Sequence, residues 1–332
     1  MNSSPSLAKN FSAGFAVLVG RPNAGKSTLT NALVGQKVAI TSNRPQTTRH
    51  TIRGIVHREK FQLIIVDTPG LHRPRTLLGE RLNDLVAQTL AEVDVVGFCL
   101  PANEKIGPGD RYIAAQLAAL GHKPIVAIVT KADTVPSAQL AQQLLNLEAL
   151  GREVFKAERE LRTNSLKGSQ SQKLAHGWAD IIPVSAVQDY QVEKLSQVFA
   201  GYLPASMPLY PDGELTDEPE ATLVAELVRE AALEGVHQEL PHSLAATVEQ
   251  MQFREGRDEK DPLLEVYINL FVERDSQKAI IIGRGGSRLK AIGSQARQSI
   301  ERMLGTRVYL DIRVKVAKDW QRDPRALGRL GF

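Results

Sequence analysis

A glycine-rich octapeptide near the N-terminus constrains the fold of this chain more than any other feature. Residues 20–27 read Gly-Arg-Pro-Asn-Ala-Gly-Lys-Ser and fit the pattern G-x-x-x-x-G-K-[ST]. The apolar segment Phe15–Val19 precedes the motif and a helical stretch, Ser27–Val34, ends it. Between a strand and a helix, such a loop surrounds a phosphate with backbone N–H groups. We therefore expect a nucleotide site, in which Lys26 neutralises the β- and γ-phosphates and Ser27 binds Mg²⁺.

Short apolar runs alternate with helical patterns through the first two thirds of the chain. This order predicts an α/β fold with a mostly parallel sheet covered by helices on both faces. Only Glu59-Lys60 separates two of the strands, too few residues for a crossover helix, so that pair is predicted to be antiparallel. After the first strand, the expected strands are 51–58, 61–66, 93–100, 124–129 and 181–184, and the expected helices are 27–34, 77–92, 111–120 and 137–150.

Further motifs follow three of these strands. Asp67-Thr-Pro-Gly70 offers a carboxylate that is expected to reach Mg²⁺ through a water, and a glycine N–H for the γ-phosphate. Thr130-Lys-Ala-Asp133 offers a carboxylate that accepts from guanine N1–H and its 2-amino group, with the Lys131 stem across the purine ring. Ser185-Ala186 offers a backbone N–H to the base oxygen. The predicted nucleotide is therefore a guanine nucleotide.

Composition shifts divide the chain into parts. We predict a flexible tail over 1–11, a nucleotide-binding domain over 12–203 with a charged surface insertion near 151–177, a linker over 204–220 and a second domain over 221–332. The linker holds three prolines within eight residues, which indicates a semi-rigid connector. No apolar run approaches the roughly 18–20 residues that a membrane-spanning helix needs, so we expect no such helix.

The net charge of +4 conceals two opposed blocks. Residues 221–275 carry five basic and twelve acidic side chains, a net of −7, whereas residues 276–332 carry thirteen and four, a net of +9. Inside the basic block, Gly283-Arg-Gly-Gly286 lies between two predicted helices. A G-x-x-G loop at such a junction lets a nucleic-acid backbone approach closely, as in KH domains. The block therefore predicts a nucleic-acid site.

The predicted order of elements in this half supports that interpretation. It runs helix, strand, strand, helix, helix, strand, which resembles the type II KH fold. The expected contacts are Gly283, Arg284, Gly285, Gly286, Arg288 and Lys290. Arg313 and Lys315, on the polar face of the last strand, either extend the phosphate-binding track or merely solvate the sheet.

Taken together, the motifs resemble the Era family of bacterial GTPases, over about residues 12–320. The resemblance implies a GTP-hydrolysing switch that binds GTP and GDP, the 3′ region of 16S ribosomal RNA and the 30S subunit, and assists 30S maturation. It implies a cytoplasmic protein with a fraction at the inner face of the membrane, and a monomer is expected. The implied GTP-binding residues are Gly20, Arg21, Pro22, Asn23, Ala24, Gly25, Lys26, Ser27, Thr28, Asp67, Thr68, Pro69, Gly70, Leu71, Thr130, Lys131, Ala132, Asp133, Ser185 and Ala186.

The resemblance also assigns a first switch to residues 43–50. Its Mg²⁺-binding threonine is Thr48, with Thr47 as the alternative. Leu71 stands where many related GTPases have a water-positioning glutamine and cannot form a hydrogen bond. GTPases with the same Gly-x-Pro-Asn loop use K⁺ bound by that asparagine, here Asn23, so we expect slow hydrolysis stimulated by K⁺ or RNA. Lys26, Thr48, Gly70 and Asn23 are then the expected catalytic residues.

There are two alternatives to this switch, and the first differs from it in class. In one, the chain is an RNA-binding module in which nucleotide only sets shape, and Leu71 keeps this interpretation open. In the other, the chain is a tRNA-modifying relative, which needs a C-terminal catalytic cysteine. The sequence has one cysteine, Cys99, in the nucleotide-binding half and within an apolar run that predicts burial. The tRNA-modifying interpretation is therefore disfavoured, and a single cysteine permits no internal disulfide.

Overall fold

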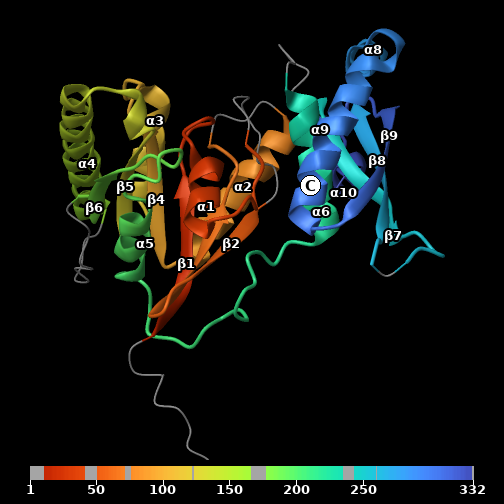
Figure 1. Cartoon of the computed structure of the whole chain (residues 1–332). Helices are drawn as coiled ribbons and strands as arrows, with labels where there is room; N and C mark the ends of the chain where they lie inside the picture. Colours follow the sequence, from red (N-terminus) through yellow and green to blue (C-terminus); the bar gives the residue numbers. More distant parts are fainter. Residues whose placement is uncertain are drawn as a thin grey trace, which may run out of the picture. The chain divides into compact units, whose positions relative to one another are not determined.

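The chain divides into two units, each with its own sheet (Figure 1). The first unit comprises residues 1–39, 50–72 and 83–217, and the second comprises residues 40–49, 73–82 and 218–332. The computed structural model describes residues 11–41, 51–71, 76–121, 123–165, 177–234, 243–258 and 260–330. Residues 1–10 of the predicted tail, the first switch with Thr47 and Thr48, and residues 166–176 lie outside these ranges.

A six-stranded sheet in the order β2-β3-β1-β4-β5-β6 forms the centre of the first unit. All neighbouring strands are parallel except β2 and β3, which form the predicted antiparallel pair with Ile55 opposite Ile64. The strands are β1 (Ser12–Val19), β2 (Ile52–His57), β3 (Phe61–Asp67), β4 (Val95–Pro101), β5 (Ile125–Thr130) and β6 (Asp180–Pro183).

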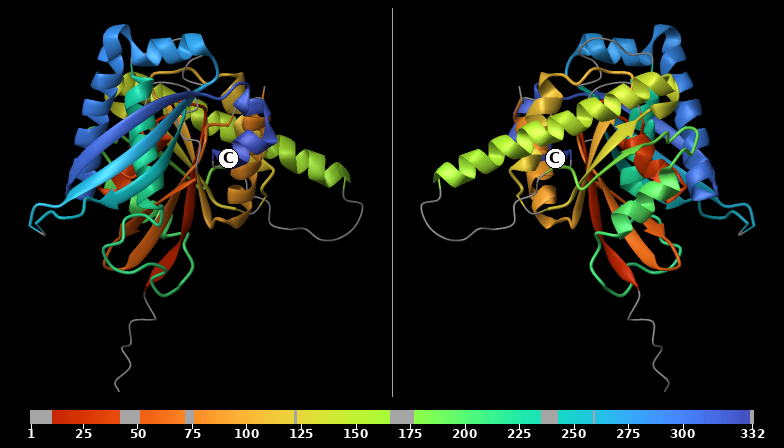
Figure 2. Two further views of the ribbon diagram at one scale, coloured as in Figure 1. Left: turned by 90° about the vertical axis from the view of Figure 1, so that its right-hand side faces the viewer. Right: turned by 90° about the vertical axis from the view of Figure 1, so that its left-hand side faces the viewer.

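Helices cover both faces of this sheet, as parallel strands buried on both sides require (Figures 1 and 2). On one face Leu33 and Phe199 belong to a core formed with α1 (Lys26–Val34) and α5 (Val192–Ala200). On the other, Val86, Ile113 and Leu147 belong to a core formed with α2 (Leu77–Glu92), α3 (Pro108–Ala118) and α4 (Ser137–Ser165).

The cysteine of β4 belongs to the first of these cores. Cys99 is fully buried, as the sequence predicted, and burial raises the pKa of its thiol to about 12. The other members of that core are almost all apolar side chains, so it packs as a small hydrophobic residue.

Helix α4 differs from its prediction. The polarity after Leu150 indicated a surface insertion from residue 151, but the helix continues to Ser165. Pairs four residues apart support the exposed continuation, including Arg152 with Glu148 and Arg162 with Glu158. The expected end at Leu150 was therefore wrong, because a solvated helix is polar on most sides and shows little hydrophobic periodicity.

The proline-containing segment packs against β2 and β3 within the first unit. Ile55 of β2 donates its N–H to the carbonyl of Leu215 over 2.9 Å. The hydroxyl of Tyr210 lies 2.6 Å from a carboxylate oxygen of Asp217, which also pairs with Arg53 at 2.9 Å. The segment from 204 to 217 thus adds to the edge of the sheet, rather than standing apart from it as a connector.

The second unit has the predicted order of elements. Helix α6 (Glu220–Leu233) precedes β7 (Ala245–Phe253) and β8 (Leu263–Val272), which pair antiparallel. Then α8 (Asp275–Ile282), a short 3₁₀ turn η3 (Arg284–Gly286) and α9 (Ser287–Leu304) lead to β9 (Arg307–Val316), which is parallel to β8. Two elements beyond β9 were not predicted from the sequence, η4 (Trp320–Arg322) and α10 (Pro324–Arg329).

Within the described ranges, no helix combines the length and apolarity needed to cross a bilayer.

Candidate nucleotide site and nucleic-acid groove

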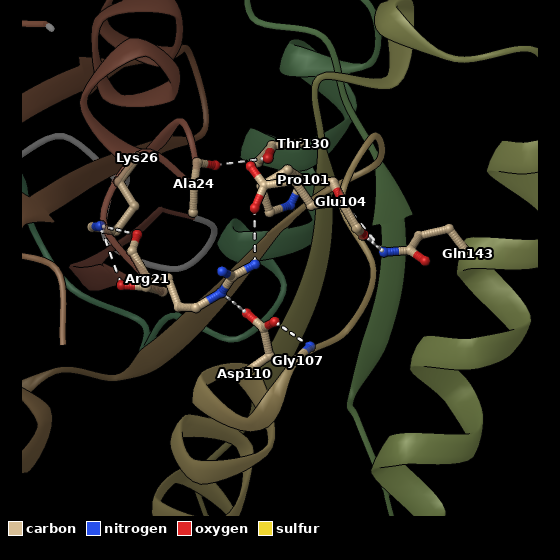
Figure 3. Close-up of polar contacts among 10 residues, drawn as sticks. Arg21, Ala24, Lys26, Pro101, Glu104, Gly107, Asp110, Thr130 and Gln143 are labelled. Carbon is tan, nitrogen blue, oxygen red and sulfur yellow. Dashed lines mark hydrogen bonds and ion pairs between the residues drawn. The ribbon is translucent and has the colours of Figure 1, made fainter. Parts of the chain in front are cut away.

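The phosphate-binding loop joins β1 to α1, as predicted. Gly25 caps the N-terminus of α1 with φ of 86°, a left-handed conformation that favours glycine. The side chain of Lys26 is buried, and its ammonium group donates to the carbonyls of Gly20 (3.3 Å) and Arg21 (3.1 Å) (Figure 3). These contacts hold the ammonium group at the loop, where it can meet a phosphate.

Oxygen donors for a metal lie at the start of α1 and the end of β3. Ser27 is half-buried in the first turn of α1, and Asp67 is fully buried at the end of β3. Burial lowers the pKa of Lys26, and the electrostatic attraction of Asp67 opposes that shift. A hydroxyl and a carboxylate are the hard oxygen ligands that Mg²⁺ prefers beside substrate phosphates, so these residues fit the metal.

The glycine after β3 lies directly against the phosphate-binding loop. A Cβ atom added to Gly70 would stand 2.7 Å from the backbone nitrogen of Pro22, closer than real Cβ contacts. The neighbouring Thr68 donates its hydroxyl to the carbonyl of Leu18 over 2.9 Å, so this side chain serves the structure of the strand end. Leu71 packs partly against the core shared by α2 and α3, as an apolar side chain should.

The predicted base-binding motifs are joined to each other and to the phosphate-binding loop. Thr130 donates its hydroxyl to the carbonyl of Ala24 over 2.7 Å (Figure 3), and Ala132 donates its N–H to the carbonyl of Val184 over 3.0 Å. Lys131 has a left-handed φ of 56° and precedes the turn that presents the exposed carboxylate of Asp133. The strand ends of β5 and β6 therefore meet beside the loop.

The other predicted residues of the nucleotide site are placed as follows. Asn23 is exposed in the loop with φ of 64°. Arg21 turns its side chain away from Lys26 and pairs with Glu104 in the loop after β4 and with Asp110 in the first turn of α3. Ala24, Pro69 and Ser185 are buried, and Pro22, Thr28 and Ala186 are half-buried.

The second site begins at the glycine-rich turn between α8 and α9. Gly283 has φ of 72°, and a Cβ atom there would stand 2.7 Å from that of Arg288. Gly285 and Gly286 also have left-handed φ values, 57° and 78°, but a Cβ atom on either meets nothing within 4 Å. The turn therefore needs glycine for its conformation throughout and for space at Gly283. Its one side chain, Arg284, is exposed.

A groove of about 770 Å³ runs from this turn between α9 and β9. Lys290, one of the predicted contacts, is exposed along it, and Arg297 and Arg307 are groove residues that were not predicted from the sequence. A signal existed for Arg297, because residues 290, 293 and 297 recur at helical spacing and so share one face of α9, in line with Gly286 at its N-cap. Small residues, Gly286 and Gly293, alternate there with the basic ones.

Three predicted contacts lie elsewhere. Arg288 donates to the carbonyl of Glu234 over 2.8 Å and so joins α9 to the end of α6. On β9, every second residue from Val308 to Val316 faces the core. Arg313 and Lys315 therefore lie on the opposite face of the sheet. Arg313 there lies 4.0 Å from Glu249 and 3.5 Å from Asp311. This placement favours the interpretation that both side chains solvate the sheet.

Comparison with known families matches both halves of the chain. A family model described as "50S ribosome-binding GTPase" matches residues 15–131, and a model described as "KH domain" matches residues 239–321. A curated relative from Streptomyces coelicolor, named GTPase Era, is 62% identical over 320 residues, covering 96% of this chain and 95% of the relative. A relative of the same name from Mycolicibacterium smegmatis is 58% identical over 323 residues, covering 97% and 99%.

Two solved structures are similar over almost the whole chain. One is Era in complex with MgGDPNP and nucleotides 1506–1542 of 16S ribosomal RNA, with a TM-score of 0.84, 33% identity and coverage of 97% of this chain and 99% of that one. The other is an Aquifex aeolicus Era variant bound to GDP and AlF₄⁻, with a TM-score of 0.82, 32% identity and the same coverage.

Proposed function

The chain belongs to the Era family of GTPases, and from this we propose a GTP-hydrolysing switch that binds the 3′ region of 16S ribosomal RNA and assists maturation of the 30S subunit. One observation carries the proposal. The loop at 20–27 and the strand ends at Asp67, Thr130 and Ser185 all lie at the carboxyl edge of one sheet, and hydrogen bonds join the end of β5 to the loop and to the end of β6. Ligands bind at that edge in open α/β sheets.

The residues of the nucleotide site divide the work of binding and hydrolysis. Lys26 and the loop N–H groups bind the phosphates, the Gly70 N–H meets the γ-phosphate, and Asp133 selects guanine. Ser27 and Asp67 would hold Mg²⁺, Asp67 through a water, and Thr48 of the first switch would be added to them. When bound, the ion neutralises charge that develops on the phosphates.

The KH unit supplies the RNA site. Its glycine-rich turn and the groove beside α9 admit a single strand, and Arg284 and Lys290 offer charge to its phosphates. The similar Era structure carries a fragment of 16S ribosomal RNA, which supports the choice of ligand. The double variant Gly283→Asp/Arg284→Glu is expected to lose binding to a 16S 3′ fragment and to retain GTP binding. Retained RNA affinity would reject the assignment.

Potassium is part of the proposal because Leu71 cannot position water. Asn23 is the candidate K⁺ ligand, exposed in the loop beside Gly20 and Lys26. Turnover is expected to be faster in K⁺ than in Na⁺, and Asn23→Ala is expected to abolish that difference. Equal rates in both salts for the native chain would exclude the ion.

Single-turnover hydrolysis separates the switch from its alternative. With GTP prebound, addition of the RNA fragment is expected to raise the rate. A rate that RNA leaves unchanged, with RNA binding that still depends on the nucleotide, would instead support an RNA-binding module whose nucleotide only sets shape.

The proposal extends to a cytoplasmic monomer with a peripheral membrane fraction. The basic block over 276–332 is the supporting feature, since such charge attracts anionic lipid surfaces. Flotation with vesicles containing anionic lipid, but not with neutral vesicles, is the expected result, and sedimentation equilibrium tests the monomer. Absence of flotation with either vesicle would reject the membrane fraction.

A further inference from the structure

We propose that Arg21 is a positioning residue for the phosphate-binding lysine, and not a ligand of the nucleotide. Its guanidinium Nε donates to Asp110 over 2.6 Å and its Nη2 donates to Glu104 over 3.0 Å (Figure 3). Two carboxylates therefore neutralise one guanidinium. The inference rests on the nucleotide site proposed above and assigns a different task to one of its residues.

The acceptor at Asp110 is held firmly. Its side chain is almost fully buried in the first turn of α3, and its second oxygen accepts the Gly107 N–H over 2.8 Å. The stem of Arg21 passes close to the backbone of α3, since a Cβ atom on Gly109 would stand 3.0 Å from the Arg21 Cδ. The guanidinium thus meets a fixed partner along a fixed path.

The second acceptor lies on a loop that is fixed from two sides. Gln143 of α4, itself buried, donates to the carbonyls of Glu104 (2.9 Å) and Pro101 (3.3 Å) (Figure 3). On the other side, the Ala102 N–H donates to the carbonyl of Thr130 over 2.8 Å. The loop that holds Glu104 is therefore secured by α4 and β5.

The backbone of the same arginine contacts the lysine. The Arg21 carbonyl accepts from the Lys26 ammonium over 3.1 Å, while the side chain of Arg21 is held by α3 and the loop after β4. Fixing the side chain fixes the residue, and with it an acceptor that sets where the ammonium lies. A small displacement of a charged group from its phosphate is costly, which is why such an anchor matters.

The two roles predict opposite signs for one substitution. If Arg21 is an anchor, Asp110→Asn weakens the anchor and lowers GDP affinity, as Arg21→Ala does. If Arg21 instead binds phosphate, Asp110→Asn releases positive charge and raises GDP affinity. Asparagine keeps an acceptor for the Gly107 N–H, so the start of α3 is preserved.

The experiment measures affinity of the full chain for a fluorescent GDP analogue. Arg21→Ala is expected to weaken binding about tenfold, the scale of one hydrogen bond to a charged group. Asp110→Asn is expected to weaken it in the same direction, and the double variant no more than Arg21→Ala alone. Arg58→Ala is the matched control, because it removes an arginine of similar exposure whose Nε and Nη2 both donate to one carboxylate oxygen of Glu193.

Two further readouts separate positioning from general loss of structure. Competition by guanosine, which has no phosphate, is expected to be unchanged in Arg21→Ala. In a Lys26→Ala background, adding Arg21→Ala is expected to cause no further loss of GDP affinity. Tighter binding by Asp110→Asn, equal loss of guanosine affinity, or an undiminished effect without Lys26 would overturn the inference. If the unchanged chain fails to bind GDP, the proposed function fails instead.

Discussion

The side-chain amide of Gln62 holds the backbone of Tyr210 from both sides. Its Nε2 donates to the Tyr210 carbonyl over 2.9 Å, and its Oε1 accepts the Tyr210 N–H over 2.9 Å. The same oxygen accepts the Leu209 N–H over 2.6 Å. A buried glutamine of β3 thus replaces a strand in satisfying the backbone of the proline-containing segment.

Gln62→Leu is therefore expected to release that segment. The substitution removes three hydrogen bonds from the partly buried backbone of Leu209 and Tyr210 and should lower the free energy of unfolding by about 1–3 kcal/mol. Hydrogen exchange at the amides of Leu209 and Tyr210 should become faster. Gln142→Leu is the control, since it removes an exposed glutamine bonded only to Asn146, and unchanged exchange in Gln62→Leu would contradict the prediction.

Thr130→Val tests the bond between the base-binding strand end and the phosphate-binding loop. Valine keeps the shape of threonine but cannot donate to the Ala24 carbonyl, so a loss of about 1–3 kcal/mol in unfolding free energy is expected. GDP affinity should fall as well, because the two motifs are no longer joined. Thr130→Ser restores the hydroxyl and should restore both quantities, whereas equal behaviour of valine and serine variants would refute the role.

Gly70→Ala should separate binding from hydrolysis. The added methyl group meets the backbone of Pro22, so Gly70 is displaced from the loop while Lys26 and Asp133 are untouched. GDP affinity is expected to stay within about twofold and kcat to fall about a hundredfold, the usual effect of a misplaced group. Gly107→Ala is the control because a Cβ atom there has 3.8 Å of clearance, and a matching fall in its kcat would count against the explanation.

Arg297→Ala and Arg313→Ala should differ in their effect on RNA binding. Arg297 lines the groove beside α9, whereas Arg313 lies on the opposite face of the sheet near Glu249. The plot of log affinity against log salt should lose about one unit of slope in Arg297→Ala, as for one phosphate contact, and none in Arg313→Ala. An equal loss in both variants would mean that RNA also covers the outer face.

Local chemistry decided which features could be predicted. The phosphate-binding loop and the motifs that contain Asp67 and Asp133 have residue types that follow from phosphate and base recognition, so they could be predicted from the sequence. The alternation of apolar and polar residues along β9 predicted which of its two faces packs against the core. The G-x-x-G turn could be predicted because its glycines suit a left-handed backbone, which Gly283 adopts.

The remaining features depend on contacts between distant residues. Nothing around Gln62 indicates that it binds residues almost 150 positions later, and nothing in the motif indicates that Arg21 turns toward Asp110. The contact of Arg288 with the Glu234 carbonyl was also not predicted, because a basic residue beside a glycine turn suits a phosphate and a helix-end carbonyl equally. The continuation of helix α4 past its expected end was not predicted, because residues 156–162 are mostly charged and show little hydrophobic periodicity.

The buried thiol of β4 makes this protein convenient for site-directed labelling. Burial raises the pKa of Cys99 to about 12, so its thiol stays protonated at neutral pH, and the same burial blocks access. A maleimide dye should therefore react with a cysteine introduced on the surface and leave Cys99 unmodified. Fluorophores could be attached to either unit without first replacing the native residue, which would report how nucleotide and RNA change the distance between labelled positions.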